Sequence, residues 1–314
     1  MSGIEAVVVD PSNAERLVIR EVPAPAALAN QALVRVKAIS LNRGEVRRSQ
    51  TAAAGFRPGW DFSGVVEQAA GDGSGPKAGA RVVGLLNSGS WAALIAAPTN
   101  AMAELPENVA FAHAATLPVA GLTALHALYK GGFLVNQPVL ITGATGGTGD
   151  FACQLAHLAG AKVVATVRSE NRKLFVKELG VDEVVVGEDP SQAAQFGPYR
   201  LIIDSVGGPQ FSKVLGMLGS RGVCVIFGTS AGAEPVINAS KFYSTGSTTL
   251  YGMIIFQELQ NEPALVGLKT LAGLVSAARL TPHIALEDSW RKVAEVAQKL
   301  TGREFTGKAV LRVD

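Results

Sequence analysis

The alternation of apolar and polar positions divides the chain into two kinds of sequence. Residues 1–110 carry short Val-rich runs separated by Pro, Gly, Asn and Asp turn signals, and this pattern predicts β-rich structure. The predicted strands in this part are 5–9, 17–22, 32–38, 64–67 and 81–85. Residues 111–130 are rich in Ala and Leu at helical spacing, with interruptions at Pro118 and Gly121.

Strand and helix signals alternate from residue 138 onward, which predicts a parallel sheet covered by helices on both faces. The predicted strands are 139–142, 162–167, 183–186, 201–204, 223–227 and 248–251. The predicted helices are 147–159, 171–179, 209–218, 262–278 and 287–300, and a closing strand is expected at 309–313. We therefore expect a central α/β domain, with both ends of the chain joining in a second domain.

A glycine-rich turn, Ala144-Thr-Gly146-Gly147-Thr148-Gly149, lies between the first predicted strand of this series and a helix. It is a variant of G-x-G-x-x-G with Ala at the first glycine position. Gly146 would let the backbone approach a pyrophosphate, and Gly149 would let the helix pack on the strand. The N–H groups at the start of the helix, around Gly147 and Thr148, would favour the diphosphate. In this strand–turn–helix context we expect a dinucleotide site rather than a packing turn that binds no ligand.

The second predicted strand ends at Arg168, where an Asp or Glu would bind the ribose hydroxyls of NAD. An acidic side chain would repel a 2′-phosphate, whereas the planar fork of Arg168 matches phosphate oxygens. Ser169 and Arg172 would add donors from the following turn, and Lys173 is a further candidate. We therefore expect NADP(H) rather than NAD(H), with a solvated charged loop as the alternative.

Two further loops follow predicted strands, and ligands of such sheets bind outside the carboxyl ends of the strands. We expect their residues to lie near the nicotinamide ribose, although ordinary loop glycines are the alternative. The candidates are Val206, Gly207, Phe227, Gly228 and Thr229. Thr123 either reaches the cofactor or caps a helix, and the sequence leaves both interpretations open.

Composition limits the classes of protein. The chain has 314 residues, 48% of them hydrophobic and 17% charged, with a formal net charge of +2. A large core in two domains is expected, and nothing indicates a nucleic-acid or acidic membrane partner. Only Cys153 and Cys224 are present, and no leader segment or membrane span is apparent, so we expect a cytoplasmic protein.

Several motifs in succession resemble the medium-chain dehydrogenase/reductase superfamily, specifically its zinc-independent quinone oxidoreductase and enoyl-reductase-like branch. The motifs are Pro58-Gly-Trp-Asp-Phe-Ser-Gly-Val-Val-Glu67, Lys77-Ala-Gly-Ala-Arg-Val-Val-Gly84, Gly89-Ser-Trp-Ala, Leu117-Pro-Val-Ala-Gly-Leu-Thr-Ala-Leu125, the glycine turn, Ile203-Asp-Ser-Val-Gly-Gly208 and Gly307-Lys-Ala-Val-Leu311. The resemblance implies an α/β protein with a GroES-like, partly open β-barrel catalytic domain at 1–112 and 252–314. It implies a Rossmann doubly wound parallel-sheet domain binding NADP(H) at 113–251, and a homodimer formed through the last sheet strand.

Zinc-dependent members of the superfamily place Cys and His at the positions that carry Asn42 and Trp60 here, and neither residue is a plausible zinc ligand. We therefore expect no metal. The resemblance makes Asn42 the leading candidate for a polar contact to the acceptor oxygen or to the nicotinamide ribose, with an Asn that only fixes a turn as the alternative. Trp60 and Tyr251 are candidate residues of the substrate cleft, and Asp61 is expected to pair with an arginine in the barrel.

The chemistry that remains is hydride transfer from NADPH to a small electrophilic acceptor, a quinone or an α,β-unsaturated carbonyl. Two alternatives stay open. One is a protein that binds NADPH as a structural or sensory ligand with little catalysis, because no residue is an unmistakable acid, base or nucleophile. The other is a zinc-independent alcohol or aldehyde oxidoreductase.

Overall fold

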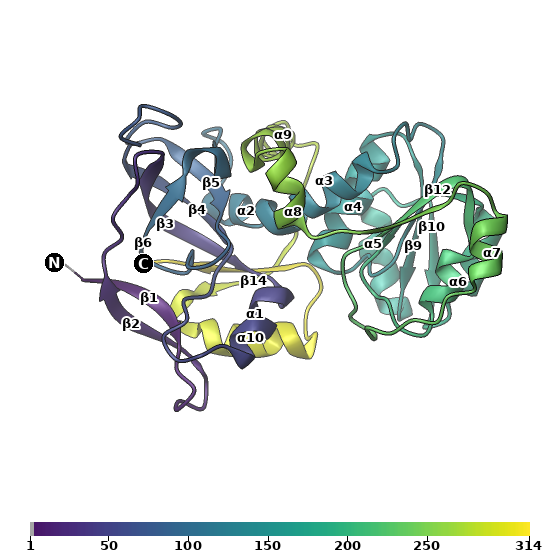
Figure 1. Cartoon of the computed structure of the whole chain (residues 1–314), viewed down its shortest axis with the longest axis horizontal. Coiled ribbons are helices and arrows are strands. Elements are labelled where there is room, and N and C mark those ends of the chain that lie inside the picture. The colour runs from purple at the N-terminus through teal and green to yellow at the C-terminus, as the bar shows by residue number, and fades with distance from the viewer. Residues whose placement is uncertain (1–2) are drawn as a thin grey trace. The chain divides into compact units, whose positions relative to one another are not determined.

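The computed structural model describes residues 3–314, which form two compact units (Figure 1). Unit 1 comprises Met1–Leu122 and Leu259–Asp314, and unit 2 is the continuous stretch Thr123–Glu258. The chain thus leaves and re-enters unit 1 somewhat later than the predicted boundaries at 112/113 and 251/252. Along residues 3–314 no helix is both long enough and apolar enough to cross a lipid bilayer.

Unit 1 is built on a seven-stranded mixed sheet and a separate two-stranded ribbon. The ribbon consists of β1 (Gly3–Val9) and β2 (Leu17–Pro23), and the sheet of β3 (Gln31–Leu41), β4 (Asp61–Gln68), β5 (Arg81–Leu85), β6 (Leu94–Pro98), β7 (Met102–Glu104), β14 (Ile284–Ser289) and β15 (Lys308–Arg312). The sheet order is β14-β15-β3-β4-β5-β7, with β6 also paired to β3. Because β15 lies antiparallel to β3, the last strand of the chain completes the sheet begun near its start. Both parts of unit 1 therefore contribute strands to one sheet, and this is the GroES-like part of the fold.

Helices surround this sheet and include a short π-helical turn. They are α1 (Arg43–Thr51), α2 (Phe111–Ala115), the π-turn η2 (Leu117–Gly121), α9 (Ala264–Ser276) and α10 (Val293–Gly302). The prediction of a helix over 287–300 is wrong in its first part. Residues 284–289 form β14, whose alternating burial lets it pair with β15, and the α-helix begins only at Val293. Helix α1, which the sequence analysis did not predict, begins directly after Asn42.

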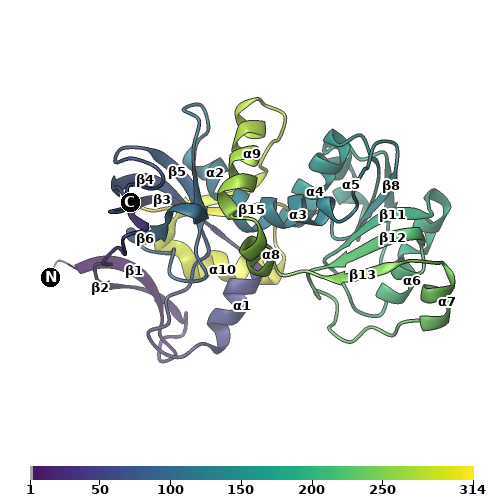
Figure 2. The same cartoon turned by 45° about the horizontal axis from the view of Figure 1, so that its top comes forward.

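Unit 2 is a six-stranded parallel sheet in the order β10-β9-β8-β11-β12-β13, and Figure 2 shows β8, β11, β12 and β13 in succession. The strands are β8 (Pro138–Ile141), β9 (Lys162–Val167), β10 (Glu183–Val186), β11 (Tyr199–Asp204), β12 (Leu218–Ile226) and β13 (Thr249–Gly252). The other elements are α3 (Leu122–Tyr129), α4 (Gly147–Leu158), η3 (Glu170–Arg172), α5 (Lys173–Glu178), η4 (Pro190–Phe196), α6 (Phe211–Leu215), α7 (Ala239–Ser244) and α8 (Ile255–Asn261). The strand order reverses between β8 and β11, which is the arrangement of a dinucleotide-binding Rossmann fold.

Both faces of this sheet are covered, which explains the nearly continuous apolar runs of its strands. Leu140, Ile202 and Cys224 belong to the cluster that receives Phe211 and Val214 of α6. Their neighbours along the strands, Ile141, Ile203 and Val225, are also fully buried. The two-sided burial confirms the predicted α/β layer arrangement.

Candidate functional site

The glycine turn lies at the point where the strand order of unit 2 reverses. It follows β8, and Gly146 is the N-cap of α4, in extended conformation with φ −84° and ψ 163°. The first N–H groups of α4 thus face the carboxyl edge of the sheet, where the helix dipole favours an anion. The predicted context of strand, turn and helix is confirmed.

The glycines at 146 and 149 serve different purposes. A Cβ on Gly149 would lie 2.3 Å from the carbonyl oxygen of Gly143 and 2.7 Å from Cα of Ala144, so only glycine lets the helix approach the turn. A Cβ on Gly146 would meet nothing closer than 3.4 Å, again the oxygen of Gly143. Packing within the protein therefore does not require a glycine at 146. The absence of a side chain there is consistent with a ligand that approaches the backbone closely.

Asp204 joins the glycine turn to the next loop, and the sequence analysis did not single it out. Its Oδ2 accepts a hydrogen bond from the hydroxyl of Thr142 at 2.7 Å, and its Oδ1 accepts from the main-chain N–H groups of Val206 and Gly207 at 3.1 and 2.7 Å. Burial raises the pKa of Asp204, and these three hydrogen bonds oppose the rise. The side chain therefore sets the positions of Val206 and Gly207, two predicted cofactor residues.

Gly228 packs directly against the loop that follows Asp204. A Cβ there would lie 2.8 Å from the main-chain oxygen of Ser205, so the backbones of the two loops are in direct contact. Phe227 donates its N–H to the oxygen of Asp204, and Thr229 is exposed at the end of the same loop. Whether these residues contact a cofactor stays a prediction, because loop packing alone accounts for the glycine.

The predicted 2′-phosphate residues lie together after β9, in and around η3. Arg172 donates from Nη1 to the hydroxyl of Thr145 in the glycine turn at 3.3 Å, and Ser169 donates to Oδ1 of Asn171 at 2.6 Å. Lys173 pairs with Glu170 at 3.0 Å. Arg168 is exposed, and within residues 3–314 its guanidinium has no ion-pair partner. Arg172 keeps its other N–H donors available for an anion, and Arg168 keeps all of its own.

Two predicted residues of unit 2 lie in buried or paired surroundings. Thr123 is buried within α3, and its contact with a cofactor stays a prediction. Tyr251 donates its hydroxyl to Oε1 of Glu258 at 2.6 Å, while the ammonium of Lys130 lies 4.4 Å from the centre of its ring and 2.7 Å from Oε2 of Glu258. Tyr251 thus belongs to a cluster with Lys130 and Glu258, and its role in a substrate cleft stays a prediction.

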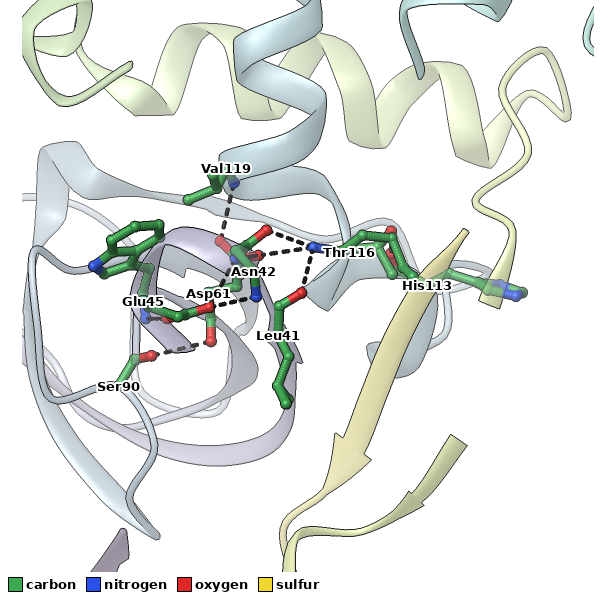
Figure 3. A network of polar contacts seen from close by, with 10 residues as sticks. Leu41, Asn42, Glu45, Asp61, Ser90, His113, Thr116 and Val119 are labelled. Atoms are coloured by element: carbon green, nitrogen blue, oxygen red, sulfur yellow. Dashed lines mark hydrogen bonds and ion pairs between the residues drawn. The ribbon is translucent and has the colours of Figure 1, made fainter. Parts of the chain in front are cut away.

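Asn42 is the centre of a buried polar cluster in unit 1 (Figure 3). Its Nδ2 donates to Oε1 of Glu45 at 2.9 Å and to Oδ2 of Asp61 at 2.8 Å. Its Oδ1 accepts a hydrogen bond of 2.6 Å from Nζ of Lys308. Both amide hydrogens of Asn42 are therefore used inside the protein, and the side chain is half-buried.

Each member of the cluster is held by a different element. Asp61 begins β4 and accepts the main-chain N–H of Val119, in the π-turn, on Oδ1 at 2.9 Å. Lys308 begins β15 and donates also to the main-chain oxygen of Leu41 at 3.2 Å. Its Nζ lies 3.6 Å from Oδ2 of Asp61. The prediction that Asp61 pairs with an arginine is wrong, because the cation is Lys308.

Glu45 connects the cluster to helix α1 and to Trp60. Its Oε1 accepts the main-chain N–H of Asn42 at 2.7 Å, and its Oε2 accepts that of Trp60 at 2.6 Å. The ring of Trp60 lies against Gly44, where a Cβ would come within 2.6 Å of it. Trp60 is half-buried, and the structure leaves its predicted role in a substrate cleft as a prediction.

The electrostatics of the cluster follow from its burial. The side chains of Lys308 and Asp61 are 4% and 0% exposed. Burial, reinforced by the charge of Asp61, raises the pKa of Glu45 well above its ordinary value. Burial also raises the pKa of Asp61 and lowers that of Lys308, while their mutual attraction opposes both shifts. Two carboxyls share one ammonium, so the fully ionised cluster would hold one excess negative charge.

The donors of this cluster do not fit zinc. Asn42 and Trp60 offer neither a thiolate nor an imidazole, and the oxygen atoms of Leu41 and Asn42 already accept hydrogen bonds from the ammonium of Lys308. In the described part of the chain, no group of three or more His, Cys, Asp and Glu side chains is placed to hold a metal ion.

Two residues of the cluster, Glu45 and Lys308, carried signals in the sequence. Asn42-Arg-Gly-Glu45 has the spacing of a helix-capping box, in which the acidic residue reaches back to the first N–H. Lys308 precedes the apolar run Ala309-Val310-Leu311 at the start of a predicted strand, a position where a charged side chain requires a buried partner.

Comparison with known proteins agrees with this geometry. Residues 28–107 match the alcohol dehydrogenase GroES-like domain, and residues 147–268 match the zinc-binding dehydrogenase domain. The chain is 30% identical over 299 residues to a chloroplast envelope quinone oxidoreductase homolog of Arabidopsis thaliana, covering 87% of this chain and 88% of the relative.

Solved structures are similar along the whole chain. The quinone oxidoreductase of Coxiella burnetii superposes with a TM-score of 0.84 at 25% identity, covering 100% of both chains. Mycobacterial Rv1454c, complexed with NADPH, superposes with a TM-score of 0.85 at 26% identity, covering 98% of this chain and 99% of the other. The chain described here belongs to the medium-chain dehydrogenase/reductase superfamily and, within it, to the quinone oxidoreductase-like branch.

Proposed function

We propose that the protein is an NADPH-dependent reductase of quinones or α,β-unsaturated carbonyls that works without a metal. The observation that carries the proposal is the carboxyl edge of unit 2. There the glycine turn opens α4 at the point of strand-order reversal, and Arg168 follows the neighbouring strand with no protein partner among residues 3–314. The quinone oxidoreductase names of the relatives and the NADPH complex of the mycobacterial neighbour support the same conclusion.

The residues of unit 2 would bind and orient the cofactor. The N–H groups at the start of α4 would hold the diphosphate, and Arg168, with Arg172 held by Thr145, would hold the 2′-phosphate. Asp204 would fix the loop with Val206 and Gly207 beside it. NADPH, when bound, supplies a hydride to the acceptor carbon, and a proton from water completes the reduction.

The residues of unit 1 would supply the environment of the acceptor. No zinc ligands stand at positions 42 and 60, so polarisation of an acceptor oxygen would rest on hydrogen bonds alone. Asn42 is proposed to make a polar contact to the acceptor or to the nicotinamide ribose, and Trp60 to form an apolar wall.

The direct test is oxidation of NADPH, followed by its absorbance, with a panel of quinones, enones and simple aldehydes. We expect turnover with at least one quinone or enone, and little with saturated aldehydes. NADPH that binds tightly but is oxidised by none of these acceptors would rule out the reductase. That result would favour a protein that uses NADPH as a structural or sensory ligand, a candidate supported by the full engagement of the amide hydrogens of Asn42.

We also propose that two copies of the chain pair through β13. This strand is at the edge of the six-stranded sheet, so one row of its main-chain N–H and C=O groups has no partner strand within residues 3–314. The side chain of Leu250 in β13 and that of Ile254, two residues after the strand, are exposed. An isologous pair of these strands would continue the sheet from one subunit to the other.

A further inference from the structure

We propose that Arg57 binds an anionic group of the acceptor, so the protein prefers quinones or enones that carry a carboxylate. Arg57 would contact the carboxylate and not the carbon that receives the hydride, which makes it a residue of substrate specificity. The proposal rests on the reductase function and names the class of acceptor within it. All the residues that carry it belong to unit 1.

The guanidinium of Arg57 has no partner in the part of the chain that the structure describes. The side chain is half-buried, and its Nε is shielded from solvent without a hydrogen bond. Burial lowers the pKa of Arg57, and no carboxylate opposes this shift. Arginine nevertheless stays charged in proteins, and a charge that is partly removed from water without a partner is unfavourable. A negatively charged ligand group would supply that partner.

The main chain at Arg57 is held by a neighbouring loop. The carbonyl oxygen of Arg57 accepts the hydroxyl of Ser88 at 2.5 Å, and that of Pro58 accepts the N–H of Gly89 at 3.2 Å. Arg57 therefore presents its side chain from an ordered main chain. A ligand has to order only the side chain, which reduces the entropy lost on binding.

Helix α1 packs along the segment that contains Arg57. Oε2 of Glu45 accepts the N–H of Trp60 at 2.6 Å, and the guanidinium of Arg48 lies 4.9 Å from the centre of the Phe56 ring. Because these contacts attach both ends of the segment to α1, Arg57 lies close to this helix.

The charges along α1 and this segment are mostly positive. Residues 43–57 contain a single acidic side chain, Glu45, which is buried in the polar cluster. The same stretch contains four arginines, which are Arg43, Arg47, Arg48 and Arg57. Its formal net charge is therefore +3, compared with +2 for the whole chain. This excess of positive charge would attract an anion toward Arg57.

The chemistry of Arg57 favours a carboxylate. The planar guanidinium can donate two parallel hydrogen bonds to the two oxygens of a carboxylate. One guanidinium balances the single charge of that group, whereas a phosphate monoester carries up to about two. Trp60, the proposed apolar wall, is three residues from Arg57, so their Cα atoms are at most about 11 Å apart. One small molecule can thus place a ring at Trp60 and a carboxylate at Arg57.

The test compares a benzoquinone that carries a carboxylic acid on a short saturated side chain with its methyl ester, which has the same ring and no charge. Steady-state oxidation of NADPH gives kcat and KM for both acceptors in the wild type, Arg57→Met and Arg57→Lys. Arg20→Met is the matched control, since Arg20 is an exposed arginine of unit 1 that pairs with Asp10 at 2.9 Å.

We expect the wild type to have a KM for the acid about 10-fold lower than for the ester, as for one charge-assisted hydrogen bond. Arg57→Met should raise the KM of the acid by about 10-fold and leave its kcat and the KM of the ester nearly unchanged. Arg57→Lys should keep part of the preference, because the charge remains while the planar fork is lost. Added salt should weaken the preference, and Arg20→Met should behave as the wild type.

Equal kcat/KM for acid and ester in the wild type would overturn the proposal. An equal loss for both acceptors in Arg57→Met would also overturn it, because Arg57 would then serve the fold. Thermal unfolding is measured beside the kinetics, and Arg57→Met should be at least as stable as the wild type, since no partner loses its charge. If Arg57→Met did not fold, a preference unchanged in Arg57→Lys and independent of salt would contradict the proposal.

Failure of the reductase function is a distinct result. A wild-type protein that oxidises NADPH with no quinone or enone, charged or uncharged, would contradict the reductase. Binding of the same acid and ester is then measured by quenching of tryptophan fluorescence. Weaker binding of the acid to Arg57→Met, with equal binding of the ester, would support the anion site without the reductase. Equal binding of the acid to Arg57→Met and the wild type would overturn the anion site as well.

Discussion

Nζ of Lys308 donates a hydrogen bond of 2.6 Å to Oδ1 of Asn42, although 266 positions separate the two residues in the chain. The contact joins the end of β3 to the start of β15, two strands that are paired in the same sheet. It places a cation beside Asn42, the residue that the resemblance puts at the position of a zinc-binding cysteine. Unit 1 thus contains a buried ammonium that is supplied by its own last strand.

The first prediction concerns the choice of cofactor. Arg168→Ala removes a free guanidinium, and we expect the Kd of NADPH to rise by about 10- to 100-fold, as for loss of a charge-assisted hydrogen bond. The Kd of NADH should change little, because NADH has no 2′-phosphate. Lys213→Ala serves as the control, since this lysine pairs with Asp189 at 3.0 Å, away from the predicted phosphate loop. Equal losses for both cofactors would contradict the phosphate assignment.

The second prediction separates the two glycines of the turn. Gly149→Ala forces a Cβ against the oxygen of Gly143 and should lower the free energy of unfolding by about 3 kcal/mol. Gly146→Ala meets no such obstacle and should change stability by less than about 1 kcal/mol. Its expected effect is on the Kd of NADPH, measured by titration beside thermal unfolding. If Gly146→Ala bound NADPH normally, the turn would not approach the diphosphate closely.

The third prediction concerns pH. Burial raises the pKa of Glu45 well above its ordinary value, so at a pH between the unfolded and the folded pKa the folded state holds a proton that the unfolded state has released. The stabilisation associated with this proton is complete below the unfolded pKa, about 4.3, and is lost as the pH rises through the folded pKa. Glu45→Gln cannot titrate, so the stability of the wild type relative to Glu45→Gln should fall with rising pH.

Urea unfolding of the wild type and of Glu45→Gln at about pH 5 and about pH 8 measures the difference between their free energies of unfolding. For one proton this difference changes by at most about 1.4 kcal/mol per pH unit. Lys292→Met, a change at the surface, should follow the wild type at both values. If the free energies of unfolding of the wild type and Glu45→Gln differed by the same amount at both pH values, Glu45 would be ionised throughout this range.

The fourth prediction concerns assembly. Sedimentation should give a mass of twice 32.5 kDa for the wild type. Leu250→Lys places a charge on the exposed edge strand β13 and should give monomers, since a buried unpaired charge opposes association. Val236→Lys changes an exposed valine outside that strand and should leave the mass unchanged. A monomeric wild type at micromolar concentration would remove the proposed dimer.

The sequence predicted most of unit 2 because its signals are local. β9 and β10 were predicted with the bounds that the structure shows, since each is a short apolar run between turn residues. The glycine turn was recognisable because its glycines are required by contacts with residues only a few positions away in the sequence. The helix predicted over 287–300 was wrong at its start because the pairing of β14 with β15 is not a local property.

The buried cluster was only partly predictable for the same physical reason. Asn42 and Asp61 were noticed, but the partner of Asp61 was expected to be an arginine and is Lys308. An ion pair between strands that are far apart in the sequence depends on which strands become neighbours in the sheet. The order of strands in the complete sheet determines this, and it is not a local property of the sequence. Asp204 was not singled out because two of its three hydrogen bonds come from main-chain N–H groups, which no residue type in the sequence marks.

The placement of Lys308 also bears on how the protein is made. Synthesis proceeds from Asn42, Glu45 and Asp61 through the whole of unit 2 before it reaches Lys308, because unit 2 is the continuous stretch Thr123–Glu258. Domains tend to fold as units as they leave the ribosome, so unit 2 can form its contacts first. The earlier part of unit 1 would then hold two carboxyls that resist burial while ionised. Its core would close last, when β15 adds to β3 and brings the ammonium with it.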